Sequence, residues 1–504
     1  MKQRDLSPSA CEPCPPGERR KWSRKGLLPV TLGLSALAYA YTGFHLTNLP
    51  GAAGVHAFLL LFAWLFLLYV MAVRTLATQH FCIQPGCVAA LVVLVGTGFR
   101  LLVLPAGIPD GITPAKLHAD LTGKEVVFNR FLLYDHDLWR FLWDGHQQAM
   151  GLNPYQYPPA CFLEPDDALE WGLTSVPAAE RARLLPNDHW RDIHAHINHP
   201  DLPTVYPPGL QLLFRLSYTL FPGSVVGWKL CLLLLDLGVM ALLWLTLTHF
   251  DQPPWKLALY AWSPLVIKEG VGTGHADALV AFMLLGLTLA LARARPVAIG
   301  IWLAAATLTK LAPLLLLPFA VRHLRWAGSC AFGLTLATGL WPFRHGEVAW
   351  AGLAAYTQHW TFNPGFSELC HGLLHLSGLP LNHAVLARTI SGGVFLTLLF
   401  LYRRQLPLTP RSAPETLLCV LGGLFFFSPT VMPWYFIWII PLAALTGQWS
   451  WLLYGGLSVL SYLIYADSDG RESATRLLLI HGSFCVAWFI ERHRVRSRTT
   501  PNIT

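Results

Sequence analysis

The sequence predicts an all-α protein that crosses a membrane many times, and three observations carry this prediction. The chain of 504 residues is 54% hydrophobic but only 13% charged, whereas soluble globular proteins carry about 25% charged residues. Its apolar residues gather in runs of roughly 20, the length that an α-helix needs to cross a bilayer. Its 20 tryptophans are typical of the aromatic belts at membrane surfaces.

Twelve apolar runs are expected to cross the membrane, and the basic residues between them set their orientation. The runs are 27–47, 55–74, 86–105, 226–248, 255–272, 276–293, 326–342, 384–402, 415–430, 433–447, 450–466 and 474–491. Because cytoplasmic loops are rich in Lys and Arg, the basic segments predict that both chain ends lie inside and the long polar loops outside. The net charge of +8 is therefore a topology signal and predicts no nucleic-acid partner.

These runs divide the chain into seven expected regions. In order they are a disordered cytoplasmic tail, N-terminal transmembrane helices, an outer loop ending in a half-helix, a central transmembrane core, a second outer loop, C-terminal transmembrane helices and a second cytoplasmic tail, at 1–26, 27–105, 106–225, 226–342, 343–383, 384–491 and 492–504. The first outer loop is far longer than an ordinary connection, and such loops are typical of functional segments.

One apolar run does not fit a single span. Residues 297–321 have basic residues at both ends, Arg293 on one side and Arg325 on the other. A short broken pair that enters the membrane and returns to the inner side satisfies both ends. Lys310 and Pro313 lie where the break is expected, and irregular backbone at this depth needs protein or a wet cavity around it.

The most informative part of the outer loop is the acidic and aromatic segment 137–145. Asp137, Arg140 and Asp144 recur at helical spacing and are expected on one helix face. An outward carboxylate near a lipid surface is suited to act as a general base, and Asp135 is its rival. The alternative is an amphipathic helix with an internal Asp–Arg pair. The other side is apolar and predicts a helix lying on the bilayer: Leu138, Trp139, Leu142 and Trp143.

Two further groups place ionisable residues near membrane depth. His275 and Asp277 follow an apolar run, with Lys268 and Glu269 shortly before them. Such residues are costly in a bilayer and usually mark a site or pair with one another. Plain loop charges at Lys268 and Glu269 are the alternative. The His-x-Asp spacing is also a weak metal-ligand pattern.

Lys310 lies inside an apolar run and is suited to bind an anionic group such as a lipid phosphate. Snorkelling of its ammonium to the membrane surface is the alternative. Trp434 and Tyr435 open a late apolar run, and Tyr206 precedes a proline pair. These aromatic residues fit either a membrane-surface belt or the lining of a sugar or prenyl groove.

Taken in order, these groups resemble a known superfamily. The matching pieces are 137–145 with 151–155, 198–208, 274–278, 309–313 and 433–435. Their order resembles the polytopic GT-C glycosyltransferases and, within them, the bacterial alpha-mannopyranosyltransferase-like proteins that use polyprenyl-phosphate mannose. The chain departs from that pattern at Phe141 and His146, where Tyr and Arg are commoner.

The resemblance implies a membrane enzyme that moves a hexose, with mannose as the expected sugar, from a polyprenyl-phosphate donor to a hydroxyl acceptor with inversion. It implies Asp137 and Asp144 as catalytic residues, with Asp137 as the base. It implies a set of substrate-binding residues: Arg140, Trp143, Asn153, Tyr155, Tyr206, His275, Asp277, Lys310, Trp434 and Tyr435.

The expected partners are the donor, membrane lipids and a lipid, glycan or protein acceptor. No cofactor and no metal ligands are predicted, although a divalent metal stays open. The expected location is the bacterial inner membrane, with the active site facing the periplasm. Two alternatives remain at this point: a flippase or transporter for lipid-linked sugars, and a GT-C transferase with another donor sugar, such as glucose or arabinose.

Overall fold

The structure is a computed structural model that describes residues 26–44, 51–78, 84–108, 113–124, 137–344, 351–467 and 472–499. The tail before residue 26 and the rival base Asp135 lie outside these ranges. Within them the only β-pairing is one isolated bridge between Phe362 and Thr430. All other regular secondary structure in these ranges is helical, as the sequence predicts.

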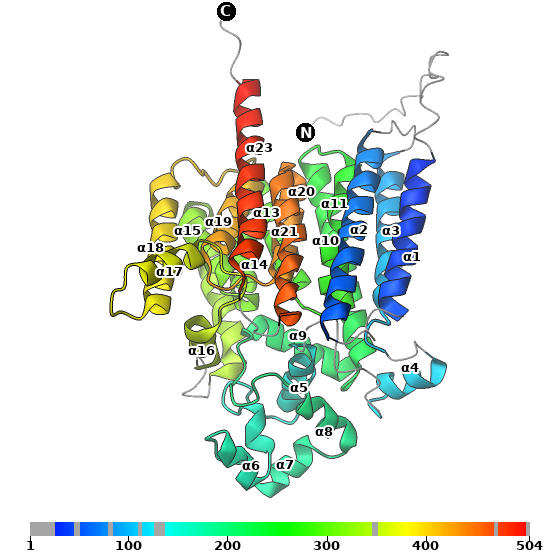
Figure 1. Cartoon of the computed structure of the whole chain (residues 1–504), viewed down its shortest axis with the longest axis vertical. Helices are drawn as coiled ribbons and strands as arrows, with labels where there is room; N and C mark the ends of the chain where they lie inside the picture. The colour runs from blue at the N-terminus through cyan, green and yellow to red at the C-terminus, as the bar shows by residue number, and fades with distance from the viewer. Residues whose placement is uncertain are drawn as a thin grey trace, which may run out of the picture.

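The described helices form an upright bundle with a smaller group of helices at one end (Figure 1). The long and segmented helices of the bundle are α1 (Leu27–Phe44), α2 (Gly51–Thr78), α3 (Pro85–Val103), α10 (Val225–His249), η4 to η5 (Pro254–Leu257, Ala258–Ala261, Pro264–Ile267 and Lys268–Gly272), α13 (Ala278–Ala292), α14 (Pro296–Thr309), η6 (Ala312–Leu316), α15 (Leu317–Leu340), α18 (His383–Tyr402), α19 (Ala413–Phe427), η8 and α20 (Pro433–Trp438 and Ile440–Thr446), α21 and η9 (Trp449–Ser458 and Val459–Tyr465), and α22, η10 and α23 (Ala474–Leu477, Leu478–Gly482 and Ser483–Thr499).

The bundle belongs to a polytopic membrane protein. Among the described residues, five helices are long and apolar enough to cross a bilayer, and four shorter helices of the bundle are also apolar. Several other predicted spans are divided into short helical pieces, because proline, glycine and polar residues interrupt their hydrogen-bond ladders. The exact number of spans therefore stays a prediction.

The broken pair predicted at 297–321 is present. Helix α14 ends at Thr309, and Lys310 has extended backbone angles (φ −147°, ψ 144°). Gly300 lies against the backbone of Gly328, and Leu308 lies against Gly339. The second half of α15 thus runs in the same direction as α14. The intervening segment 310–324, which we call the return segment, must therefore run in the opposite direction.

The return segment ends at a sharp reversal. Arg325 has a φ of 51° and interrupts α15, a backbone conformation that L-residues rarely adopt. Gly300 and Gly328 allow the two parallel helices to approach so closely that a Cβ on either glycine would collide with the facing backbone. The return segment therefore begins at the break at Lys310 and ends at the turn at Arg325.

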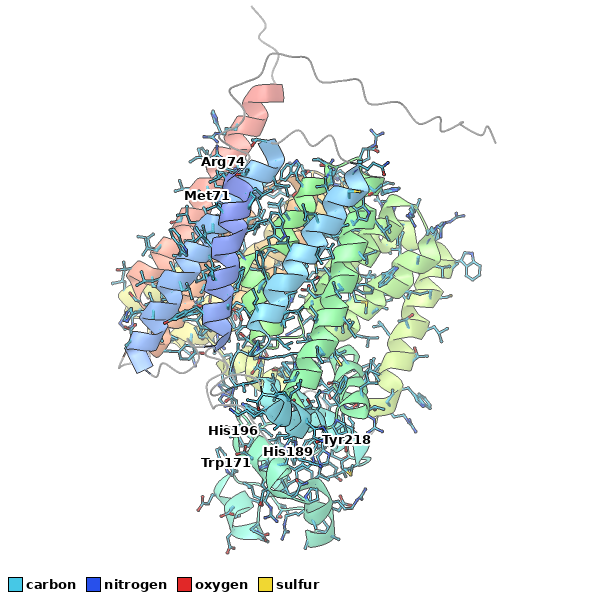
Figure 2. The ribbon with its side chains drawn as sticks, turned by 90° about the vertical axis from the view of Figure 1, so that its right-hand side faces the viewer. Met71, Arg74, Trp171, His189, His196 and Tyr218 are labelled. Atoms are coloured by element: carbon cyan, nitrogen blue, oxygen red, sulfur yellow. The ribbon has the colours of Figure 1, made fainter. Side chains whose placement is uncertain are left out.

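The smaller group of helices, which we call the outer subdomain, comprises residues 113–124 and 137–224. Its elements are α4 (Pro114–Leu121), α5 (Asp137–Ala149), η3 (Pro159–Phe162), α6 (Pro165–Glu170), α7 (Ala178–Leu184), α8 (Asp188–Ala195) and α9 (Pro208–Leu220). Figure 2 shows His189, His196 and Tyr218 at this end of the molecule and Arg74 at the opposite end of the bundle.

Helix α5 is buried in the core of the outer subdomain, which differs from the expectation that its apolar side lies on the bilayer. Trp143 packs edge-on against Phe162 and His194, and Trp139 stacks on His196. An apolar helix face has the same periodicity whether lipid or protein covers it. Here the loop folds back over the helix and provides that cover.

The outer subdomain is attached to the bundle by polar contacts at the start of α10. The Asp120 carboxylate accepts hydrogen bonds from the backbone N–H groups of Val225 and Val226 and from the Ser224 hydroxyl. A carboxylate at a helix N-terminus satisfies otherwise unpaired N–H groups and the helix dipole. The Trp228 indole also donates to the carbonyl of Gly274, which fixes the turn before α13.

His146 is expected to make the outer subdomain sensitive to acid. Its ring stacks on Trp190 at 3.7 Å between centroids, its Nε2 donates to the carbonyl of Leu184, and burial lowers its pKa to about 4. The unfolded chain binds this proton near pH 6.5, so stability is complete above pH 6.5 and falls as the pH drops towards 4. The maximum loss is about 3 kcal/mol.

Thermal unfolding followed by tryptophan fluorescence between pH 7.5 and 4 measures this loss. Burial also lowers the pKa of His189 and of His194, so they add slope of the same sign. His146→Gln keeps an N–H for Leu184 but does not titrate. A slope as steep in this variant as in the parent chain would contradict the assignment to His146.

Candidate functional site

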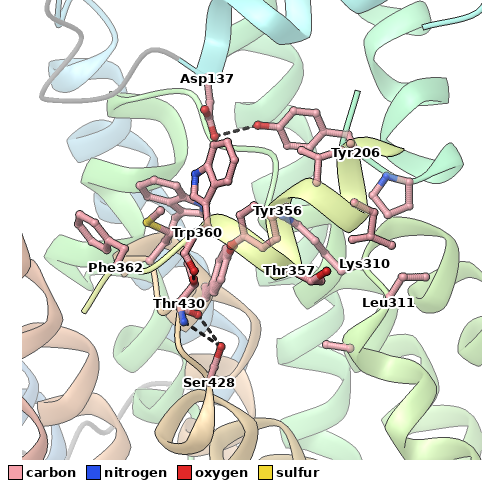
Figure 3. A pocket seen from close by; sticks show the side chains of 18 of the residues that line it. Asp137, Tyr206, Lys310, Leu311, Tyr356, Thr357, Trp360, Phe362, Ser428 and Thr430 are labelled. Atoms are coloured by element: carbon pink, nitrogen blue, oxygen red, sulfur yellow. Dashed lines mark hydrogen bonds between the residues drawn. The ribbon is translucent and has the colours of Figure 1, made fainter. Parts of the chain in front are cut away.

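A cavity of about 690 Å³, which we call the chamber, lies where the outer subdomain meets the bundle. Its lining includes six of the residues that the sequence singles out, and Figure 3 shows several of them together. These six are Asp137, Arg140, Tyr206, Lys310, Trp434 and Tyr435. They come from four segments that are far apart in the chain, so the fold itself assembles the group.

Asp137 is the first residue of α5 and lines the chamber. Its Oδ2 accepts a hydrogen bond of 2.8 Å from the Tyr206 hydroxyl, which Figure 3 shows as a dashed line. The Tyr206 ring is held edge-on by Phe141 and Phe214. A carboxylate at this helix terminus is favoured by the dipole, and one well-packed tyrosine fixes its direction.

Lys310 stands at the break between α14 and the return segment, with its ammonium among three aromatic rings. Its Nζ lies 5.2 Å from the ring centroid of Tyr435, 5.7 Å from that of Tyr206 and 5.8 Å from that of Trp438. These distances are within the range of cation–π attraction. Since Tyr206 also contacts Asp137, one side chain interacts with both the carboxylate and the ammonium.

A buried polar group contacts the aromatic wall of the chamber, by which we mean Trp434, Tyr435, Trp438 and Tyr356. Asp277 is 4% exposed and accepts a 2.5 Å hydrogen bond from the indole N–H of Trp438. His275 stacks on Trp434 at 3.8 Å between centroids, and its Nδ1 lies 3.5 Å from a carboxylate oxygen of Glu269. His275 and Asp277 thus contact residues that line the chamber, although they do not line it themselves.

The carboxylate of Glu269 also pairs with the ammonium of Lys268 at 2.9 Å. Tyr462 accepts from Lys268 and donates to Glu269. Lys268 and Glu269 are thus a buried ion pair and not the plain loop charges that the sequence left as the alternative. Burying both charges is acceptable because each has its partner, and the pair is connected through His275 to the chamber wall.

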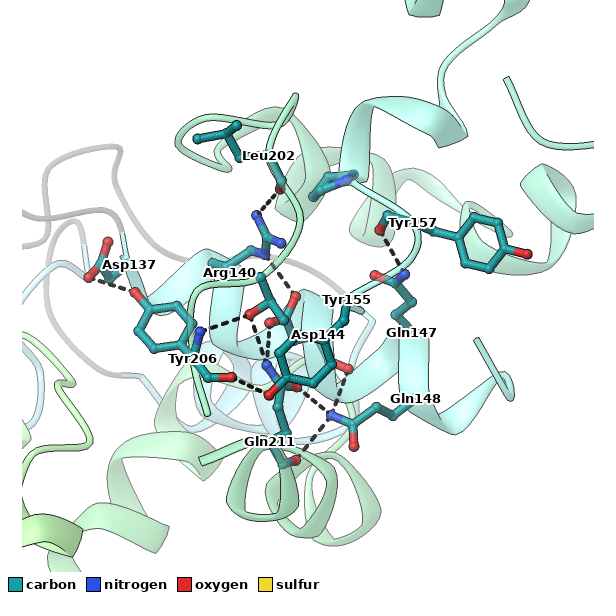
Figure 4. A network of polar contacts seen from close by, with 12 residues as sticks. Asp137, Arg140, Asp144, Gln147, Gln148, Tyr155, Tyr157, Leu202, Tyr206 and Gln211 are labelled. Carbon is teal, nitrogen blue, oxygen red and sulfur yellow. Dashed lines mark hydrogen bonds and ion pairs between the residues drawn. The ribbon is translucent and has the colours of Figure 1, made fainter. Parts of the chain in front are cut away.

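Arg140 and Asp144 form an internal ion pair in α5, and Figure 4 shows the network around it. The Arg140 Nε lies 2.8 Å from Asp144 Oδ1, and its Nη1 donates to the carbonyl of Leu202. Gln211 donates to the second oxygen of Asp144. Within the described part of the chain, the buried Nη2 of Arg140 has no hydrogen-bond partner, so its two N–H bonds are left without an acceptor.

The remaining predicted site residues lie behind the chamber. Asp144 is fully buried, and Trp143 belongs to the core of the outer subdomain. Asn153 accepts from the backbone N–H of Tyr155 and closes a turn. The hydroxyl of Tyr155 donates to the backbone carbonyl of Tyr206 at 2.6 Å. These contacts fix the segments that carry Arg140 and Tyr206.

The lining also contains residues that were not predicted, and three aromatic residues among them contact or extend the predicted group. Tyr356 and Trp360 come from α16 (Ala351–His359) and the residue after it, and Trp438 ends η8. The Tyr356 hydroxyl bonds to that of Tyr435. The sequence holds one signal, two aromatic residues four apart in the second outer loop, which share a helix face. In the described ranges no group of three or more His, Cys, Asp or Glu has the geometry of a metal site.

Residues 204–433 match the model of glycosyltransferase family 87, a GT-C-type membrane family. The chain is a membrane glycosyltransferase. The matched segment of this glycosyltransferase contains Tyr206, His275, Asp277 and Lys310, whereas Asp137 precedes it. The comparisons with curated proteins and with solved structures gave no match.

Proposed function

We propose that this glycosyltransferase moves a hexose from a polyprenyl-phosphate donor to a hydroxyl acceptor, with inversion at the sugar carbon. The proposal rests on one observation: the carboxylate of Asp137 and the ammonium of Lys310 line one chamber, and both interact with Tyr206. Transfer from a sugar phosphate needs both groups: a base for the acceptor and a cation for the phosphate that leaves.

Asp137 is the proposed general base. The acceptor hydroxyl gives its proton to the Asp137 carboxylate while its oxygen attacks C1 of the sugar. The bond from C1 to the phosphate oxygen breaks, and its electrons leave with polyprenyl phosphate. The Tyr206 hydroxyl donates to one oxygen of this carboxylate and so fixes the direction of the Asp137 side chain. Attack from the side opposite the phosphate inverts C1.

Lys310 and Arg140 are proposed to hold the phosphate. Lys310 is oriented by aromatic rings, and the buried Nη2 of Arg140 has no protein partner in the described residues. A charged donor in a largely apolar cavity stabilises a developing negative charge more strongly than it would in water. The proposed role of Asp144 changes accordingly: it is a positioning residue that orients Arg140 and does not touch the substrate.

An apolar groove of about 370 Å³ supports a lipid-linked donor. This first groove shares Leu311 and Leu315 with the chamber and continues between the return segment and α18 to Arg403. Its position beside Lys310 suits a prenyl chain whose phosphate is bound at the break. The hydrocarbon chain would gain affinity by leaving the more mobile lipid phase for a shaped surface.

Trp434, with the ring of His275 stacked behind it, is proposed to bind the sugar face. Aromatic rings present broad, weakly polar surfaces that suit the C–H faces of sugars. The assignment of mannose rests on the resemblance of the motifs and not on this geometry. The proposed location is the bacterial inner membrane, with the chamber facing the periplasm and both termini in the cytoplasm.

Asp277 is proposed to act through Trp438 and Lys310, so its loss should not add to the loss of Lys310. Asp277→Asn keeps an acceptor for the indole N–H and is expected to retain turnover within about 10-fold. Asp277→Leu removes the acceptor, so Trp438 would no longer hold the Lys310 ammonium in place. This displacement should lower kcat by about 10²-fold. A double-mutant cycle with Lys310→Met measures the coupling. Full additivity would contradict the positioning role.

A donor panel tests the proposed function. The purified protein would be given polyprenyl-phosphate mannose, glucose or arabinose together with a membrane extract as acceptor source, and the product would be analysed by NMR. The proposal predicts one mannosyl product whose anomeric configuration is opposite to that of the donor. A product with retained configuration would contradict the single displacement, and transfer of glucose or arabinose alone would correct the donor sugar.

A further inference from the structure

We propose that Arg388 is a positioning residue that couples the first groove to the chamber. This inference rests on the proposed function and adds to it a residue that does not itself line the chamber. Its basis is that one helix, α18, contacts both features. Near its start, Arg388 holds the segment that carries Tyr356 and Trp360. Further along the helix, Leu396 and Phe400 line the first groove.

Arg388 caps the C-terminus of α16. Its Nη1 donates to the backbone carbonyls of Thr357 and Gln358. Its Nη2 donates to the carbonyl of Trp360 at 3.3 Å and to the Thr361 hydroxyl at 2.7 Å. The last carbonyls of an α-helix have no partner within the helix, and a cation beside them complements the helix dipole. One guanidinium group thus orders the last turn of α16 and the residues that follow it.

Tyr356 connects α16 to the proposed phosphate site. It immediately precedes the residues whose carbonyls Arg388 binds, and it lines the chamber, as Figure 3 shows. Its hydroxyl bonds to that of Tyr435, and the Tyr435 ring lies 5.2 Å from the ammonium of Lys310. A displaced last turn of α16 would therefore change the surroundings of the cation that is proposed to stabilise the leaving phosphate.

Trp360 connects the same segment to the outer subdomain. Its ring packs edge-on against that of His199, with 4.6 Å between the centroids. Its carbonyl accepts a hydrogen bond from the Thr430 hydroxyl as well as from Arg388. Without Arg388, Thr430 would still hold this carbonyl. The segment should therefore stay folded in an Arg388 variant but be placed less precisely over the chamber.

Helix α18 is suited to respond to a chain in the first groove. It stands at the edge of the bundle (Figure 1), and of the five long apolar helices in the described ranges it is the least buried, at 17%. A prenyl chain against Leu396, Leu399 and Phe400 would add contacts where the protein supplies few. Arg388 lies only about 12 Å from Leu396 along the helix axis, so an occupied groove should also fix Arg388.

This coupling has a consequence for donor chain length. Binding energy from a remote part of a substrate can be used to place groups at the reacting centre, and it then raises turnover as well as affinity. A donor whose chain fills the first groove should therefore be turned over faster than a donor with a truncated chain, even when both saturate the protein. Without Arg388, chain length should affect donor binding alone.

A comparison of two donors tests the inference. Full-length protein in nanodiscs, with a membrane extract as acceptor source, would be given polyprenyl-phosphate mannose or an analogue truncated to two isoprene units. Turnover at saturating donor and the donor KM would be measured for the parent chain, Arg388→Met and Arg388→Lys. The matched control is Arg191→Met, which removes an exposed arginine of the outer subdomain that pairs only with exposed Asp188 among the described residues.

The inference predicts that the parent chain turns over the full-length donor about 10-fold faster than the truncated one, and that Arg388→Met reduces this ratio to about twofold or less. The ratio of the two KM values should stay as in the parent chain, because the first groove is unchanged. Arg388→Lys should give an intermediate ratio, since an ammonium reaches fewer of the four acceptors than a guanidinium. Arg191→Met should behave as the parent chain does.

Three results would overturn the inference. A ratio in Arg388→Met as large as in the parent chain would refute the coupling, and so would equal turnover of both donors by the parent chain. Equal losses of turnover with both donors in Arg388→Met would refute the connection to the first groove. If Arg388→Met does not give a monodisperse protein, Arg388→Gln replaces it with the same expected direction. Absence of release with every donor, already in the parent chain, would instead refute the proposed function and the inference with it.

Discussion

Asp137→Asn is expected to lower the rate of sugar transfer by about 10²–10⁴-fold, the usual contribution of a general base. The amide keeps the size of the side chain and can still accept a hydrogen bond from Tyr206, so the chamber should keep its shape. What it loses is the ability to take the acceptor proton. The effect should fall on kcat, because donor binding depends on Lys310, Arg140 and the groove.

The matched control for this variant is Asp188→Asn, which changes a fully exposed carboxylate of the outer subdomain. It should leave the rate within about twofold. Donor binding to Asp137→Asn, measured with a labelled donor, should equal that of the parent chain. Undiminished turnover in correctly folded Asp137→Asn would remove Asp137 from the mechanism, and Asp135 would then be the base to test.

Lys310→Met is expected to lower turnover by about 10²–10³-fold, as the loss of one charged donor to a developing anion does elsewhere. Methionine keeps much of the apolar stem that packs among Tyr206, Tyr435 and Trp438 and removes the ammonium. Because the positive charge favours the phosphate more as the C1–O bond breaks, kcat should fall more than donor affinity.

Arg293→Met is the control, since Arg293 is exposed at the opposite end of α14. It removes one positive charge from the same part of the chain without touching the chamber. Lys310→Arg should recover part of the lost turnover, because it restores the charge but not the compact shape of the ammonium. Equal losses in Lys310→Met and Arg293→Met would indicate a general effect of charge on membrane insertion.

The sequence predicts the local structure near the site better than the packing around it. It predicts a helix over the acidic motif, and α5 spans Asp137–Ala149. It also predicts a break at Lys310, because the basic residues on both sides of the run cannot lie on opposite sides of the membrane. Both predictions rest on local chemistry that needs no knowledge of distant contacts.

The surroundings of α5 could not be predicted in the same way. Its apolar face suits a bilayer or a protein core equally well, and only the folding of residues 151–197 over it decides between them. The burial of Asp144 also depends on a distant segment, because its second oxygen is satisfied by Gln211 from α9, a residue 67 positions away in sequence.

The aromatic wall of the chamber is a second feature that could not be predicted from the sequence. Trp438 and Tyr356 reach the site from segments that are remote in sequence, and each also resembles an ordinary residue of a membrane-surface belt. Their roles can be inferred only from contacts in the structure: Trp438 bonds to Asp277, and Tyr356 bonds to Tyr435. Neither contact can be predicted from the spacing of residues in the sequence.

The most direct test of the central claim is release of polyprenyl phosphate from labelled polyprenyl-phosphate mannose by purified protein in nanodiscs. A nanodisc encloses no second compartment, so transport alone gives no signal. The account predicts release that requires an acceptor extract, occurs with the parent chain and is lost in Asp137→Asn. Quantitative recovery of every intact lipid-linked sugar that the protein binds would contradict it and favour a flippase.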